Sequence, residues 1–75
     1  MQVRVKLMGI LKEKTPGNGA LLLRDGATIT DALNALEIPV KGVHVFTVNG
    51  QLVRDKRREL TADDELTVLP PVGGG

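Results

Sequence analysis

The sequence predicts a small α+β domain in which one helix lies across one face of a mixed β-sheet. Residues 2–8 alternate between apolar and polar side chains, residues 28–37 carry apolar side chains at helical spacing, and Asn49-Gly50 marks a tight hairpin. Strand pairs flank the helix on both sides along the chain, so a sheet with the helix across one face is the natural arrangement. The 75 residues, 41% of them hydrophobic, suffice for one such domain.

The N-terminal part of the chain predicts a hairpin with a wide loop. Residues 2–8 form a half-buried strand, and Ile10 and Leu11 then break its alternation, which indicates a short loop or a turn of helix. Residues 12–19 contain Pro, Asn and Gly and therefore favour a polar loop. Residues 20–24 are the partner strand.

The helix is expected over residues 28–37. Thr28 is a suitable N-cap, and Asp31, three residues later, completes a variant of the capping box. Pro39 disfavours helical backbone at the preceding residue and is expected to end the helix. One apolar stripe follows the helical period and comprises Ile29, Ala32, Leu33 and Leu36.

The second half of the chain predicts three more strands. Residues 43–48 and 51–54 form a hairpin around the type I′ turn at Asn49-Gly50. A charged loop follows, with Leu60 as a single apolar anchor, and residues 66–69 form the last strand. The first and last strands are expected to pair in parallel at the centre of the sheet, so that the end of the chain leaves from its middle.

Composition excludes several classes of function. Ten Lys and Arg residues balance nine Asp and Glu residues, and Phe46 is the only aromatic residue, so neither a phosphate footprint nor a base-stacking platform is present. Cys and Ser are absent, and His44 alone cannot build a histidine metal site. No stretch approaches the roughly 20 apolar residues that span a bilayer. We expect a cytoplasmic protein that binds neither nucleic acid nor membrane.

Three other features each have a structural and a functional interpretation. Phe46 belongs either to the core, which we favour, or to a partner contact. His44 is expected to be a solvated strand residue. The basic residues of the charged loop are either solvated, which we favour, or steer an acidic partner, and they are Arg54, Lys56, Arg57 and Arg58.

Residues 70–75, with the sequence Pro-Pro-Val-Gly-Gly-Gly, predict a thin tail that leaves the folded body, residues 1–69. Proline cannot donate to a sheet ladder, and glycine is the residue most costly to order. Such a tail can thread a narrow channel and present the Gly75 carboxylate to chemistry in a partner. The alternative is a frayed terminus or an expression remnant.

The chain resembles the ubiquitin-like β-grasp sulfur carriers, a family that contains the small subunit of molybdopterin synthase and the thiamine sulfur carriers. The specific part of this resemblance is the closing segment, residues 64–75, which reads DELTVLPPVGGG. The first strand, the helix entry at residues 26–33 and the Val48-Asn49-Gly50 hairpin also match. Two positions depart from the family's pattern: Asp63 stands where glycine is frequent, and Gly73 where the molybdopterin members often carry alanine.

The resemblance implies a carrier protein and not an enzyme. Gly75 would be adenylated with ATP by a ubiquitin-activating-type enzyme and then converted by a sulfur donor enzyme to a thiocarboxylate. No cofactor is expected to be bound to the carrier itself. The favoured role is sulfur donation in molybdopterin biosynthesis, inside a catalytic large subunit of molybdopterin synthase. The residues expected to enter or dock on these partners are Gly74, Gly73, Val72, Pro71 and Leu69.

Other roles share the same first chemical step. The carrier could supply sulfur for thiamine, cysteine or thiolated tRNA, because the acceptor is chosen by the partner. A ubiquitin-like modifier joined to lysines of target proteins also begins with a C-terminal adenylate. A plain interaction domain with a tail is the remaining alternative.

Overall fold

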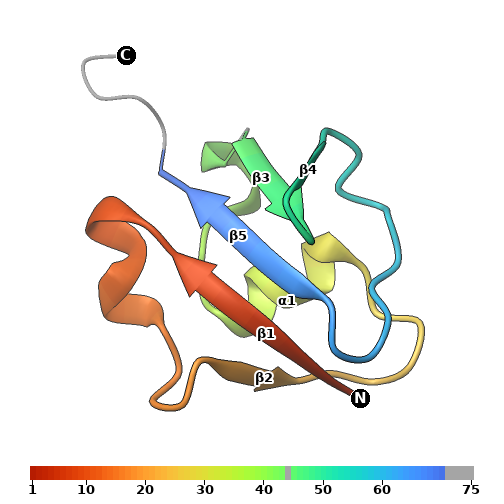
Figure 1. Ribbon diagram of the computed structural model, residues 1–75. Coiled ribbons are helices and arrows are strands. Elements are labelled where there is room, and N and C mark those ends of the chain that lie inside the picture. The colour runs from red at the N-terminus through yellow and green to blue at the C-terminus, as the bar shows by residue number, and fades with distance from the viewer. Residues whose placement is uncertain (44, 71–75) are drawn as a thin grey trace.

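The computed structural model describes residues 1–43 and 45–70, and its elements follow the predicted β-β-α-β-β-β order (Figure 1). Within these residues, the strands are β1 (Gln2–Leu7), β2 (Ala20–Leu22), β3 (Val45–Val48), β4 (Gln51–Val53) and β5 (Glu65–Leu69). The helical elements are the α-helix α1 (Ile29–Ala35) and two 3-10 segments, η1 (Gly9–Lys14) and η2 (Val40–Gly42).

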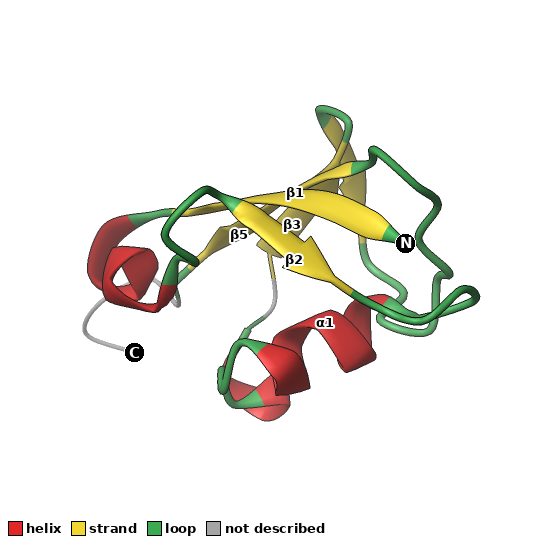
Figure 2. Ribbon diagram, turned by 90° about the horizontal axis from the view of Figure 1, so that it is seen from below, coloured by secondary structure: helices red, strands yellow, loops and turns green. Residues whose placement is uncertain are grey.

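The strands form one mixed sheet in the order β2-β1-β5-β3-β4. The first and last strands pair in parallel at its centre, as predicted, with Val5 opposite Leu66. All other neighbours are antiparallel, and both hairpins are present. The helix α1 lies across one face only, and no helical element covers the other face of the sheet in the described part of the chain (Figure 2). The predicted β-grasp architecture is therefore confirmed.

The hydrophobic core fills the space between α1 and the covered face of the sheet. Side chains of β1 alternate strictly between exposed and buried, because successive residues of a strand point to opposite faces. Phe46 is fully buried, so the core interpretation of this residue is confirmed, and the anchor Leu60 is 2% exposed. The whole apolar stripe predicted for the helix is buried and comprises Ile29, Ala32, Leu33 and Leu36.

The helix begins as predicted but ends earlier than predicted. The Thr28 side chain accepts from the Asp31 backbone N–H, and the Thr28 N–H donates to the Asp31 carboxylate, which completes the capping box. At the other end, Glu37 adopts a left-handed φ of 60°, and the Ile38 N–H donates to the Leu33 carbonyl. This Schellman closure ends the helix before Pro39 can act.

Strand limits and turns differ from the prediction only locally. Residues 8, 23–24, 43 and 54 lie outside the strands, while Glu65 extends the last strand, and η1 occupies part of the loop expected at residues 12–19. Asn49 and Gly50 both have positive φ, 53° and 83°, so the type I′ turn is confirmed. Asp63 has a φ of 69°. This aspartate thus takes a backbone conformation that glycine adopts freely.

Candidate functional site

The candidate site is the end of the sheet from which the chain continues beyond Pro70. The last strand, β5, is central and lies between β1 and β3. Leu69 stands opposite Val45 of β3, and the Met8 N–H donates to the Val68 carbonyl at 3.1 Å on the other side. The prediction that the end of the chain leaves from the middle of the sheet is therefore confirmed as far as Pro70.

Of the site residues predicted from sequence, the structure places Leu69, which is 36% exposed at the end of β5. The remaining five lie outside the described residues, as does His44, and they are Pro71, Val72, Gly73, Gly74 and Gly75. Their predicted roles stay predictions.

An apolar patch adjoins Leu69 on the uncovered face of the sheet. We define the open-face patch as Val45, Thr47, Leu52 and Leu69. Val45 is 41% exposed and Leu52 is 57% exposed, although both lie in strands of the sheet. The register places Val45 opposite Leu69 and Thr47 opposite Leu52, so the four side chains are neighbours. Exposed apolar side chains grouped in this way mark interaction surfaces.

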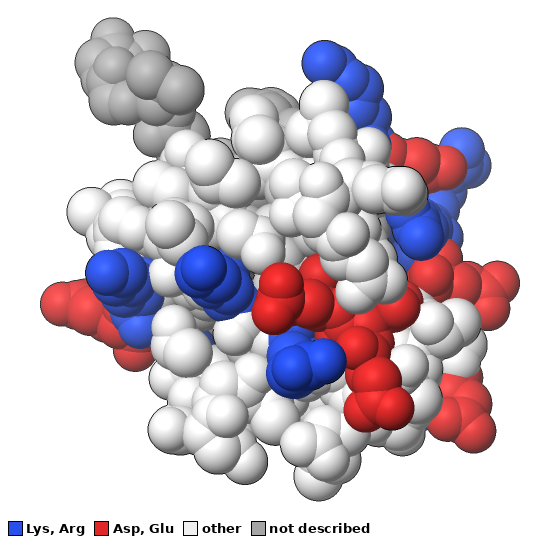
Figure 3. All heavy atoms as spheres, viewed as in Figure 1, with Lys and Arg blue, Asp and Glu red and all other residues white. Residues whose placement is uncertain are grey.

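The charge distribution separates this patch from the rest of the face (Figure 3). Uncharged surface lies over β3 and the upper end of β5, whereas Lys, Arg, Asp and Glu form a band across the middle of this view and along its right-hand side. Arg4, Lys6 and Glu65 contribute to the charged band, because they are charged residues on the outward face of β1 and β5. The patch is therefore an apolar area with a charged border, next to the last described residues.

The patch residues other than Leu69 were not singled out from sequence. Their signal was present in the alternation, since Val45 and Thr47 flank the core residue Phe46 and so must face away from the helix. The alternation alone does not show that Leu52 of β4 and Leu69 of β5 lie beside these two residues of β3. The register between strands decides this.

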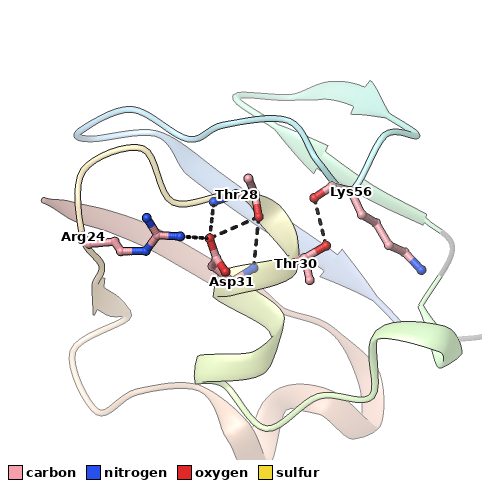
Figure 4. Close-up of polar contacts among 5 residues, drawn as sticks. All are labelled: Arg24, Thr28, Thr30, Asp31 and Lys56. Atoms are coloured by element: carbon pink, nitrogen blue, oxygen red, sulfur yellow. Dashed lines mark hydrogen bonds and ion pairs between the residues drawn. The ribbon is translucent and has the colours of Figure 1, made fainter.

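The basic loop at residues 54–59 has a structural role through its backbone (Figure 4). The Lys56 carbonyl accepts from both the N–H and the hydroxyl of Thr30, and the Arg58 carbonyl accepts from the Ile29 N–H. The Lys56 ammonium donates to the Val40 carbonyl. The bonds from the Ile29 and Thr30 N–H groups satisfy donors of the first helical turn, which have no partner within the helix.

The basic side chains of this loop differ in their exposure to solvent. Lys56 is half-buried against η2, whereas Arg54, Arg57 and Arg58 are exposed. Arg57 pairs locally with Asp55, at 3.4 Å between Nε and Oδ1. The loop is solvated at its arginines, as favoured from sequence, and fastened to α1 through its main chain.

Asp31 is the charged centre of the helix entry, away from the candidate site (Figure 4). The Thr28 N–H donates to Asp31 at 2.9 Å, and this bond is the main cause of a pKa below the ordinary value of this carboxyl group. Partial burial opposes that shift, and Arg24, at 3.2 Å, adds to it. The arrangement stabilises the helix start.

The described residues contain neither a metal centre nor a membrane span. No three His, Cys, Asp or Glu side chains among residues 1–43 and 45–70 are placed to hold a metal ion. None of the helices in that same part of the chain is long and apolar enough to cross a membrane.

Comparisons with known proteins agree with this geometry. The sequence model described as ThiS family matches residues 5–75. The crystal structure of SAMP1 from Haloferax volcanii aligns with a TM-score of 0.73 at 26% identity, over 100% of both chains. A second structure, of H. volcanii small archaeal modifier protein 1, gives the same TM-score and identity over 95% of this chain and 98% of that one.

A third solved structure has the same fold at lower identity. It is the protein–protein complex of subunits 1 and 2 of molybdopterin-converting factor from Helicobacter pylori 26695. The aligned chain is 24% identical with a TM-score of 0.63, over 100% of both chains. Comparison with curated protein sequences finds no match.

The mixed sheet, the single crossing helix and the central last strand define a protein of the ubiquitin-like β-grasp class. Within that class the assignment is specific. The chain belongs to the ThiS family, because the family model covers all but the first four residues.

Proposed function

We propose that the protein carries sulfur as a thiocarboxylate on Gly75 and donates it to a biosynthetic acceptor. The observation that carries this proposal is the family match, which extends through the three glycines to residue 75. The central position of β5 supports it, because this strand leads the chain out beside the exposed open-face patch.

The chemistry follows from the weakness of a carboxylate as an electrophile. The Gly75 carboxylate oxygen attacks the α-phosphate of ATP, a P–O bond forms, and pyrophosphate leaves. A sulfur atom from the donor enzyme then attacks the acyl carbon and displaces AMP. If the donor sulfur is a persulfide, a thiol must next cleave the S–S bond, which releases a disulfide and leaves the thiocarboxylate on the carrier.

The chain supplies the carboxylate, and the partners supply the catalytic groups. The proposed partners are a ubiquitin-activating-type adenylating enzyme, a sulfur donor enzyme and an acceptor enzyme. We propose that the open-face patch docks on these partners, so that the residues beyond Pro70 enter their active sites. ATP is bound by the activating enzyme, and no cofactor is needed on the carrier.

The favoured acceptor is the pterin precursor of molybdopterin, inside a catalytic large subunit. The similarity to a chain of the Helicobacter pylori molybdopterin-converting factor complex supports this choice, together with the Pro70-Pro71-Val72 segment. The alternative within the class is sulfur supply for thiamine, cysteine or tRNA, and the match to the ThiS family is compatible with both.

A second candidate function is conjugation to target lysines. The similarity over 95% of this chain to a structure described as a small archaeal modifier protein favours it. Both functions begin with the same adenylate, so they are separated by the product and not by the first step.

The composition of the chain makes the test sharp. Trypsin releases residues 59–75 as one peptide, because no Lys or Arg follows Arg58, and this peptide contains no Met. A mass increase from exchange of oxygen for sulfur therefore cannot be confused with methionine sulfoxide, which has nearly the same mass. Because the chain has no Cys, a thiol-specific label on the intact protein reports the thiocarboxylate alone.

We would purify the native protein from its own source and analyse this peptide by mass spectrometry. Sulfur in place of oxygen at Gly75 supports the carrier, whereas the same peptide as a branch on target lysines supports the modifier. An unmodified Gly75 that also resists ATP, the activating enzyme and a sulfur donor would contradict both. Gly75→Ala is the matched control and is expected to fold normally but not to be activated, because its Cβ clashes in a channel that fits glycine.

A further inference from the structure

Gly9 and Pro70 are in direct contact at the candidate site, although they lie 61 positions apart in the sequence. Gly9 follows β1 as the first residue of η1, and Pro70 follows β5. A Cβ built on Gly9 would lie 2.9 Å from Cγ of Pro70 and 3.6 Å from its Cδ. The first distance is shorter than real carbon contacts allow, so the proline ring occupies the space that a side chain at residue 9 would fill.

The backbone at Gly9 gives a second, independent reason for glycine. Its φ of +57° lies in the left-handed region, which side chains disfavour. The neighbouring structure holds this turn in place: the Leu11 N–H donates to the Met8 carbonyl, and the Leu11 side chain is buried in the core. The segment that carries Gly9 is thus anchored, and it forms a firm surface for the proline ring.

Contact with the Pro70 ring can restrain the backbone, because the ring includes main-chain atoms. Proline locks its own φ near −65°, so a contact on the ring also restrains the backbone from which the chain continues. Met8, the residue before Gly9, donates its N–H to the Val68 carbonyl. Leu69, the next residue of β5, is still paired with Val45. Leu69 is thus held by the sheet, and the next residue, Pro70, packs against Gly9.

We infer that Gly9 is a positioning residue for the proposed carrier function: by admitting the Pro70 ring, it sets the direction in which the chain leaves the sheet toward Gly75. This inference rests on the proposed activation of Gly75. Gly9 itself touches no substrate. Its contribution is to present the terminal carboxylate in line with ATP once the open-face patch has docked on the activating enzyme.

The protein offers a matched control at the opposite end of the sheet. Gly50 also has a positive φ, +83°, but a Cβ there would meet no atom within 4 Å. Gly9→Ala and Gly50→Ala therefore introduce the same group on comparably strained backbone, and only Gly9→Ala displaces Pro70. Any effect common to both variants reports backbone strain, and an effect confined to Gly9→Ala reports the contact.

The test is ATP–pyrophosphate exchange by the activating enzyme with the full chain as substrate. We expect kcat to fall about 10- to 100-fold for Gly9→Ala, the range for a misplacement of roughly 1 Å at a reacting group, with KM unchanged. Gly50→Ala should match the wild type in both constants while losing a similar amount in Tm. Equal kcat for the two variants, or a Gly9→Ala defect confined to KM, would overturn the inference.

A second variant tests whether the effect passes through the proline ring. Pro70→Ala removes Cγ and Cδ, so it should lower kcat by itself, and Gly9→Ala should add nothing further in its presence. Multiplication of the two single effects in the double variant would show that Gly9 acts by another route. The amide NMR shifts of residues 72–75 should change in Gly9→Ala and not in Gly50→Ala, which tests the direction of the chain without activity.

The two proposals fail in distinguishable ways. If the wild type supports no ATP–pyrophosphate exchange with an activating enzyme that is active on its own carrier, the proposed function fails. The NMR comparison of the two glycine variants still tests whether Gly9 sets the direction of the chain. If the wild type is active and the two glycine variants are equivalent, the positioning role of Gly9 alone is rejected.

Discussion

The two ends of strand β5 are held by different kinds of interaction. At its start, Asp64 accepts hydrogen bonds from the Thr61 N–H at 2.8 Å and from the Asn49 side-chain amide at 2.9 Å. The Asn49 side chain in turn accepts from the Glu65 N–H at 2.9 Å. These four residues, the polar cluster, join the turn after β3 to the turn before β5, with the Asp64 side chain buried.

The opposite end of β5 is apolar and partly uncovered. Val45 and Leu69 face one another with 41% and 36% exposure, and Pro70 packs on Gly9. Beside this end, the Met8 N–H donates to the Val68 carbonyl, and the pairing of Leu69 with Val45 is the last that the described residues show.

The difference separates stability from recognition along one strand. A buried carboxylate with all its bonds satisfied is specific and costly to disturb, so the polar cluster fixes the register of β5. Apolar side chains left exposed add little to the stability of the isolated domain but are available to a partner. Substitutions at the two ends should therefore change different quantities.

The largest expected effect is on stability, at the polar cluster. Asp64→Ala leaves the Thr61 N–H and the Asn49 amide without their buried acceptor, which should lower the free energy of unfolding by about 2–3 kcal/mol. Urea unfolding measures this loss. Asp25→Ala, at a carboxylate that is 96% exposed, should stay within about 0.5 kcal/mol of the wild type. Similar losses for both variants would show that the polar cluster adds no more to stability than an exposed carboxylate does.

Acid should weaken the same end. Burial alone would raise the pKa of Asp64, but the bonds from Thr61 and Asn49, with the charge of Arg58, together hold it below the ordinary 3.8. A lowered folded-state pKa means that the contribution to stability is present above pH 3.8 and is lost as the pH falls through the folded-state pKa. The free energy of unfolding, measured in urea from pH 6 down to pH 2, should fall in this window.

Asp64→Asn is the variant that isolates this carboxylate. It should flatten the acid dependence, apart from the part due to Asp31 and Asp55, whose pKa values are also lowered by backbone N–H groups. An acid dependence as steep as that of the wild type would assign the effect to those two carboxylates instead.

At the apolar end the expected effect is on recognition. Leu52→Ser removes an exposed side chain of the open-face patch and should raise KM for the activating enzyme about tenfold, equivalent to about 1.4 kcal/mol. Tm should stay close to the wild-type value, because Leu52 is 57% exposed. Leu22→Ser is the matched control, at a leucine that is 79% exposed on β2, at the far edge of the sheet. An equal rise in KM for Leu22→Ser would contradict docking through the patch.

The smallest expected effect lies away from both ends. Thr28→Ala removes the N-cap of α1 and should lower the free energy of unfolding by about 1 kcal/mol. Thr28→Ser keeps the hydroxyl group and should retain most of the stability. Neither variant should alter KM or kcat of activation at a temperature where both are folded. A kinetic effect here would show that activation follows overall stability and not the geometry of one end.

Much of the fold followed from local patterns. The capping box, the apolar stripe, the Asn49-Gly50 turn and the burial of Phe46 each depend on residues close together in the chain, and the structure confirms them. The end of the helix was wrong by two residues. Left-handed Glu37 closes the helix because Ile38 folds back onto Leu33, and neither residue type signals this in the sequence.

By itself, the sequence determined the fold class, the family and the predicted importance of the closing segment, because alternation, capping and the glycine tail are local in the chain. Only the tertiary structure decided which residues surround that segment. The pairing of Val45 with Leu69, the bond from Asn49 to Asp64 and the contact of Gly9 with Pro70 each join distant parts of the chain. Their physical basis is strand register and packing, which depend on the whole sheet and not on any one segment.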